Sequence, residues 1–190
     1  MAKYEDVNFY HLQRYRNGDF DLNDWQRFLE NPQAWRRSEG GLYTLDVEYG
    51  LTFEQQVAAG KYDWKDSAVQ PNRWLIEGSG NQKFQAELLH LPSPKKGYNT
   101  TDEVLAEAKR HGLIRPSAEH ILAFGAQHPN VQKEFPVVGL FEEKHCWRSS
   151  DGSLGVLCLN FVSRERNLCV DWLSVEWHER CRFLFLRNIA

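Results

Sequence analysis

The stretch at positions 112–141, GLIRPSAEHILAFGAQHPNVQKEFPVVGLF, predicts a helix followed by a buried strand. Gly112 can end a preceding helix, because glycine adopts a positive φ without steric cost. Ser117 can cap the next helix by accepting a hydrogen bond from a free N–H of its first turn, and Pro129 cannot continue that helix. The run that starts at Pro136 is short and apolar, which is typical of a central strand.

The segments before this stretch alternate between strand and helix signals. Positions 42–49 alternate apolar and polar side chains, which predicts a strand with one buried face. Thr52 and Thr100 are each followed three residues later by Gln or Glu, the pattern of a capping box, so each predicts a helix start. Positions 74–76 and 83–91 flank a turn rich in glycine and together predict a hairpin.

Three more strands are predicted after the central stretch, at 154–161, 168–173 and 181–187. Their spacing and the turn signals between them are typical of an antiparallel meander. With the helices before them, they predict an α+β domain at 83–190, preceded by an N-terminal α/β segment at 1–82. In that segment Asn23 or Asp24 can cap a helix whose apolar face carries Trp25, Phe28 and Leu29.

Composition and charge exclude some classes of function. The chain has 190 residues, 42% of them hydrophobic, which suits one globular domain with an extension. Its formal charge of -3 gives no support for binding nucleic acid, which needs a basic surface. The polar start predicts no signal peptide, and no apolar run approaches the roughly 20 residues that span a bilayer. The default prediction is a soluble cytoplasmic protein.

The four cysteines all lie in the last quarter of the chain, at Cys146, Cys158, Cys169 and Cys181. No C-x-x-C pair is present, so a zinc ribbon is not predicted. The spacing suits one cysteine per strand, either as small buried residues or as a disulfide between neighbouring strands. A catalytic thiol, or a Cys/His site that joins Cys146 and Cys181 to the nearby histidines, is a further alternative. We predict no cofactor and no metal. The histidines at 111, 120 and 128 are expected to be surface or capping residues.

Two motifs carry a resemblance to a known fold. Leu113 to His120, LIRPSAEH, resembles the entry to the second helix of C-type-lectin-like domains of the bacterial form, and the ending at 177–187, WHERCRFLFLR, resembles their closing strand. This form is shared by formylglycine-generating-enzyme-like domains and by the variable proteins of diversity-generating retroelements. The segment 115–125, with 135–140, is also similar to a group of bacterial proteins that end in R-F-L-A-V-R. The resemblance covers roughly residues 83–187.

The resemblance implies a binding function without a metal. Formylglycine-generating enzymes use a pair of cysteines near the C-terminus, whereas Cys181 has no second cysteine close by, so that activity is not implied. The E-P-N, Q-P-D and W-N-D motifs of calcium-dependent sugar-binding lectins are absent. The use of the fold that remains implied is a variable surface displayed by the late strands and loops.

The candidate ligand-binding residues therefore lie at 145–180. Trp and Arg supply large contact areas and versatile donors at binding surfaces. The candidates are Trp147, Arg148, Asn160, Arg164, Arg166, Asp171, Trp177, His178 and Arg180. We expect a non-enzymatic protein that binds a protein or cell-surface ligand and can form a homo-oligomer. The alternatives are an enzyme that uses Cys181 or His178, and a structural subunit of a phage or mobile element that assembles through its N-terminal helices.

Overall fold

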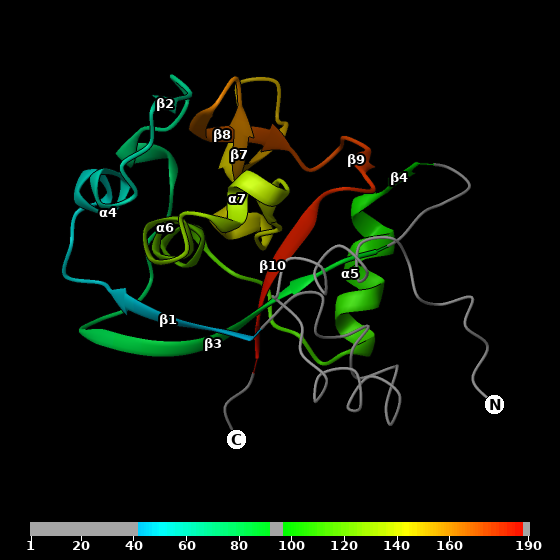
Figure 1. Cartoon of the computed structure of the whole chain (residues 1–190), viewed down its shortest axis with the longest axis horizontal. Helices are drawn as coiled ribbons and strands as arrows, with labels where there is room; N and C mark the ends of the chain where they lie inside the picture. The colour runs from blue at the N-terminus through cyan, green and yellow to red at the C-terminus, as the bar shows by residue number, and fades with distance from the viewer. Residues whose placement is uncertain (1–41, 92–96, 188–190) are drawn as a thin grey trace, which may run out of the picture. The chain divides into compact units, whose positions relative to one another are not determined.

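The computed structural model describes residues 42–91 and 97–187 (Figure 1). The helix predicted after Asn23 or Asp24 lies outside the described residues. In chain order the elements are β1 (Leu42–Glu48), α4 (Phe53–Ala59), β2 (Trp64–Lys65), β3 (Asn81–Leu89), β4 (Tyr98–Asn99), α5 (Thr101–Arg110), α6 (Ala118–Gln127), α7 (Val131–Glu134), β5 (Val137–Gly139), β6 (Trp147–Arg148), β7 (Leu154–Val162), β8 (Glu165–Trp172), β9 (Trp177–His178) and β10 (Arg182–Arg187). Short 3₁₀ turns occupy Pro71–Arg73 and Glu143–His145.

Most of the strands form one mixed sheet in the order β1-β3-β10-β5-β7-β8-β2, with β6 paired to β7. The pairs β10/β5 and β2/β8 are parallel, and the other pairs of this sheet are antiparallel. A separate two-stranded sheet joins β4 to β9. The predicted α+β class is confirmed at this level.

The predicted meander of three neighbouring strands is wrong for its last strand. β7 and β8 do form an antiparallel hairpin, but β10 leaves β8 and inserts between β3 and β5. The reason is that Phe183 to Leu186 are all buried, so this strand is covered on both faces and belongs in the middle of a sheet. Regular spacing predicts where strands occur, and it does not predict their partners.

The hairpin predicted between 74–76 and 83–91 is also wrong. Residues 74–80 form no strand, and β3 pairs instead with β1, in a register that joins Leu45 to Phe84. The segment before β3 serves another purpose: Trp74 buries its indole beside Phe141, with ring centroids 6.0 Å apart. The boundary predicted between 82 and 83 falls inside β3.

The helix starts predicted at Thr52 and Thr100 are confirmed. Thr52 and Thr100 accept hydrogen bonds from the N–H groups of Gln55 and Glu103, whose side chains bond back to the two threonine N–H groups. α5 ends at Arg110, and Gly112, two residues later, adopts φ of 65° as expected. His120 completes the start of α6, because its Nδ1 accepts from the Ser117 N–H at 3.1 Å.

The two longest helices, α5 and α6, cover opposite faces of the sheet. Successive side chains of a strand alternate between faces. Phe84 faces α6, where its ring lies 4.5 Å from that of His120. Phe183 faces the other way and packs against Trp177, which bonds to the first residue of α5. In Figure 1, α5 and α6 accordingly lie on either side of β10.

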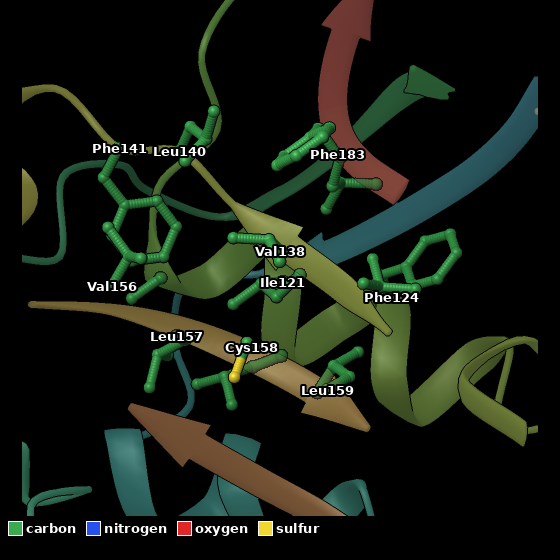
Figure 2. Close-up of a cluster of buried hydrophobic side chains, with 14 of the residues drawn as sticks. Ile121, Phe124, Val138, Leu140, Phe141, Val156, Leu157, Cys158, Leu159 and Phe183 are labelled. Atoms are coloured by element: carbon green, nitrogen blue, oxygen red, sulfur yellow. The ribbon is translucent and has the colours of Figure 1, made fainter. Parts of the chain in front are cut away.

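The core on the α6 side joins helix and sheet residues that are fully buried. Figure 2 shows Ile121 and Phe124 of α6 in one cluster with Leu157 and Leu159 of β7. β5, predicted to be a central strand, lies between β10 and β7. No helix within 42–91 and 97–187 is long and apolar enough to span a bilayer.

Candidate functional site

A groove of about 510 Å³ opens on the α5 side of the sheet. Segments that are far apart in sequence build it: the first turns of α5, Arg115 before α6, the chain on either side of β6, and the loop from β8 to β9. Its lining consists of Thr100, Thr101, Asp102, Leu105, Arg115, Glu143, Ser153, Leu154, Leu173, Ser174, Val175 and Glu176.

The floor of the groove is apolar and its rim is acidic. Leu105, Leu154 and Leu173 are partly exposed and pack on the hydrophobic core. The carboxylates in the lining are those of Asp102, Glu143 and Glu176, and all three residues are exposed. The groove therefore offers apolar contact below and negative charge above.

Arg115 is the one cationic residue in this lining, and the backbone already binds it. Its Nε donates to the Leu140 carbonyl at 2.9 Å, and its Nη2 donates to the Phe141 carbonyl. Partial burial lowers the pKa of the guanidinium, against the opposing effect of Cys146, Glu142 and Glu143. Arg115 thus secures the loop after β5, and the three carboxylates of the lining outnumber its single positive charge.

Trp177 holds the β8–β9 loop against α5. Its indole Nε1 donates to Thr101 Oγ1 at 2.9 Å, and the same hydroxyl donates to the Leu173 carbonyl at 2.6 Å. Only 3% of Trp177 is exposed, and its ring packs edge-on against Phe183. Trp177, predicted to contact a ligand, instead fixes one wall of the groove from behind.

Trp147 and Arg148 lie beside the groove. Trp147 packs against Trp172 with ring centroids 5.2 Å apart, and the Arg73 guanidinium lies 4.2 Å above the Trp147 ring. The rings can meet because Gly155 lies between them: a Cβ there would be 3.0 Å from Trp147. Arg148 is exposed, and its guanidinium approaches Glu143 on the rim at 3.8 Å.

Arg166 and Arg164 lie at the other end of β8. Six residues separate Arg166 from Trp172, which is roughly 20 Å along a strand. The Arg166 guanidinium donates to the carbonyls of Gly60 and Gly125 at 2.6 and 2.7 Å, and to Gln132 Oε1 at 3.0 Å. It therefore ties the β7–β8 hairpin to α4 and α6. Arg164 is exposed in the hairpin turn, with φ of 69°.

The remaining predicted residues divide between two places. Asn160 and Asp171 are partly buried on β7 and β8, and burial raises the pKa of Asp171. His178 ends β9 and Arg180 lies in the turn after it; both are exposed, and His178 Nδ1 accepts from the Arg180 N–H at 3.1 Å. The predicted residues thus do not gather on one face. Of the predicted region, the part that lines the groove is 153–154 and 173–176.

The thiol alternative gains no support from the geometry. Cys181 is buried, and burial raises its pKa to about 11, so little of it is a nucleophilic thiolate at neutral pH. Burial likewise raises the pKa of Cys146 to about 11. Within the described ranges, no group of three or more His, Cys, Asp or Glu side chains is arranged to hold a metal ion. The alternative that relies on N-terminal helices falls on residues outside the described part.

Sequence reasoning missed the α5 side of the groove. The capping box at Thr100 predicted the helix, but nothing local indicates that Thr101 and Leu105 face the loop after β8. It also missed a buried polar cluster beneath α6. There Glu119 Oε1 accepts from the Glu77 N–H at 3.0 Å, and His145 Nε2 lies 3.3 Å from Glu77 Oε2.

His120 belongs to this cluster, and its environment favours the neutral imidazole. Burial, with the nearby His145, lowers the pKa of His120 to about 4. Burial, with the charge of Glu119, raises the pKa of Tyr49 to about 12. His120 Nε2 and Glu119 Oε2 have no hydrogen-bond partner among the described residues. Glu119, His120 and His145 are buried whereas Glu77 is exposed, and we assign the cluster to packing and not to ligand contact.

Compared with known proteins, the chain matches no protein-family model, no curated protein and no solved structure.

Proposed function

We propose that this is a non-enzymatic binding protein that holds a protein or cell-surface ligand in the groove between α5 and the β8–β9 loop. The observation that carries the proposal is the groove itself, with a volume of about 510 Å³, an apolar floor and an acidic rim. Binding sites for small groups are typically of this size and combine apolar walls with a few polar groups. Loops held by a rigid scaffold are also where binding residues concentrate.

The lining favours a cationic ligand segment with an apolar neighbour. Asp102, Glu143 and Glu176 attract positive charge, while the one guanidinium of the lining is held by backbone carbonyls. Leu154 and Leu173 can receive an apolar side chain or the aliphatic stem of a lysine or arginine. A peptide segment in which Lys or Arg adjoins an apolar residue therefore fits best.

We further propose that the unit is a variant of the C-type-lectin-like fold. The order of the main elements from β3 onward supports this: strand, helix, helix, strand and then late strands, as the resemblance implies. The first motif lies at the entry to α6, and the second ends in β10. β10 pairs with β3, so the two ends of the similar region are neighbours in the sheet.

The test is a selection of random peptides displayed on phage against the full chain, immobilised in its folded state. Ser174→Arg adds bulk and positive charge inside the groove. Ser79→Arg is the matched control, because Ser79 is also exposed and lies outside the groove lining. We expect the selected peptides to be rich in Lys or Arg beside apolar residues. Their affinity for the Ser174→Arg protein should fall at least roughly tenfold, which corresponds to about 1.4 kcal/mol.

The salt dependence gives a second measurement on the same peptides. If the exposed carboxylates attract them, their dissociation constants should rise with ionic strength. Failure to enrich any peptide, or equal binding to both serine variants, would place ligand binding outside this groove and refute the proposal.

A further inference from the structure

We propose that Cys158 and Cys169 are a redox modification site, which forms a reversible disulfide across β7 and β8 by exchange with a small-molecule disulfide such as oxidised glutathione. This goes beyond ligand binding and does not depend on it. Both cysteines are free thiols in the structure.

The register of the hairpin brings the two cysteines together. Cys158 and Cys169 are direct partners in the antiparallel ladder, between the pairs Leu157/Val170 and Leu159/Leu168. Directly opposite residues have Cα atoms about 4.5–5.5 Å apart and side chains on the same face. A disulfide accepts Cα separations of about 4.4–6.8 Å. The bond can therefore form without moving the backbone out of register.

The two thiols differ in the way that an exchange reaction requires. Cys158 is 4% exposed, whereas Cys169 is partly exposed and can meet a small molecule from solvent. Hydrogen bonds from the Cys158 thiol and the Asn160 side chain lower the pKa of Cys169, although burial and the carboxylates of Asp66 and Asp171 oppose them. The bond to Cys169, together with burial, raises the pKa of Cys158. Cys169 is thus the attacking thiol and Cys158 the resolving thiol.

The other two cysteines have neither feature. Cys146 and Cys181 are buried, with pKa values raised to about 11. Neither lies opposite another cysteine in the strand ladders. They therefore serve as internal controls in the same chain.

The reaction balances without any group from the protein beyond the two thiols. The Cys169 thiolate attacks one sulfur of oxidised glutathione, which releases one glutathione thiolate and leaves a mixed disulfide on Cys169. Cys158 then loses its proton and attacks the Cys169 sulfur, which releases the second glutathione. Two protein thiols are oxidised to one disulfide, and one glutathione disulfide is reduced to two thiols.

The new bond would lie close to the groove. Along β8, Cys169 and Asp171 point to the same face, and along β7 so do Cys158, Val156 and Leu154. Leu173 follows β8 directly, and its N–H donates to the Leu154 carbonyl at 2.9 Å. Leu154 and Leu173 line the groove. Oxidation would join the two strands that carry this wall and raise the temperature at which the hairpin unfolds.

The experiment uses the folded full chain in buffers of reduced and oxidised glutathione. The reaction is quenched with acid, free thiols are alkylated, and the intact mass and peptide map are measured. We expect the wild type to lose two hydrogen atoms and to yield a peptide that joins Cys158 to Cys169. The variant Cys158→Ala should accumulate one glutathione on Cys169, and Cys169→Ala should remain reduced. A variant with both Cys146→Ala and Cys181→Ala should react like the wild type.

The wild-type measurement decides the outcome even if an alanine variant fails to fold. Four reduced thiols in a buffer rich in oxidised glutathione would overturn the proposal, and so would a disulfide that joins Cys158 to Cys181. A Cys158→Ala protein that folds, as judged by circular dichroism, yet gains no glutathione would overturn the assignment of Cys169 as the attacking thiol.

Discussion

Replacing Arg166 by methionine should lower the free energy of unfolding by about 3 kcal/mol. Methionine keeps an unbranched stem but removes the guanidinium, which donates to the carbonyls of Gly60 and Gly125 and to Gln132 Oε1. All three acceptors belong to buried residues. Each hydrogen bond that ties a buried acceptor contributes about 1 kcal/mol net, and the three together give the figure.

Urea unfolding followed by circular dichroism measures the effect. With an m-value of about 2 kcal/mol/M, a loss of about 3 kcal/mol lowers the midpoint by about 1.5 M. Arg164→Met is the matched control. Arg164 lies two residues away in the same hairpin and is exposed, so its replacement should change stability by no more than about 0.5 kcal/mol. Arg166→Lys should recover only part of the loss, because an ammonium cannot span the same three acceptors.

Equal midpoints for Arg166→Met and Arg164→Met would refute this argument. Such a result would mean that water replaces the guanidinium at all three acceptors. Arg166 would then be free to act as the ligand-binding residue that the sequence predicted.

Three further changes test other parts of the structure. The unfolded state takes up a proton at His120 near pH 6.5 and the folded state only near pH 4, so acidification should remove up to about 3 kcal/mol of stability between these values. The His120→Gln variant should lack this part of the pH dependence. A His120 imidazole that titrates near pH 6.5 by NMR in the folded protein would contradict the lowered pKa. Gly125→Ala should lower the free energy of unfolding in urea by about 1–3 kcal/mol, because the alanine Cβ would lie 2.0 Å from the Tyr62 hydroxyl. Adding Tyr62→Phe removes that oxygen and should restore part of the lost stability. Strict additivity of the two substitutions in the free energy of unfolding would argue against the clash. Trp177→Phe should lower stability by about 1–2 kcal/mol, because the indole hydrogen bond to α5 is lost. The control Trp64→Phe, at a side chain that is 47% exposed, should have little effect on thermal unfolding. Equal melting temperatures for the two variants would contradict the anchoring role of Trp177.

Local signals in the sequence predicted the elements well. Thr52 and Thr100 marked helix starts because a capping box joins residues only three apart. Gly112 marked a helix end because only its own φ matters there. The alternation at 42–49 predicted the buried face of β1, where Leu45 and Val47 are nearly inaccessible.

The candidate site was predicted only in part. The region 145–180 was singled out for its Trp and Arg residues. The residues of this region that line the groove are Ser153, Leu154 and 173–176. Two of the candidate side chains, Trp177 and Arg166, instead hold the structure together. The partners of Arg166 at Gly60 and Gln132 are 106 and 34 residues away, so no local pattern could reveal them.

The sequence by itself determined the positions of β1, α4, β3, α5, α6, β5, β7, β8 and β10 to within a few residues, because such signals depend on neighbours within one turn or one strand. The tertiary structure alone decided that β10 enters the middle of the sheet, that Cys158 faces Cys169, and that α5 closes a groove beside the start of β7 and the loop after β8. These outcomes depend on burying apolar faces from distant segments against one another. The free energy of that burial belongs to the pair of faces and not to either segment alone.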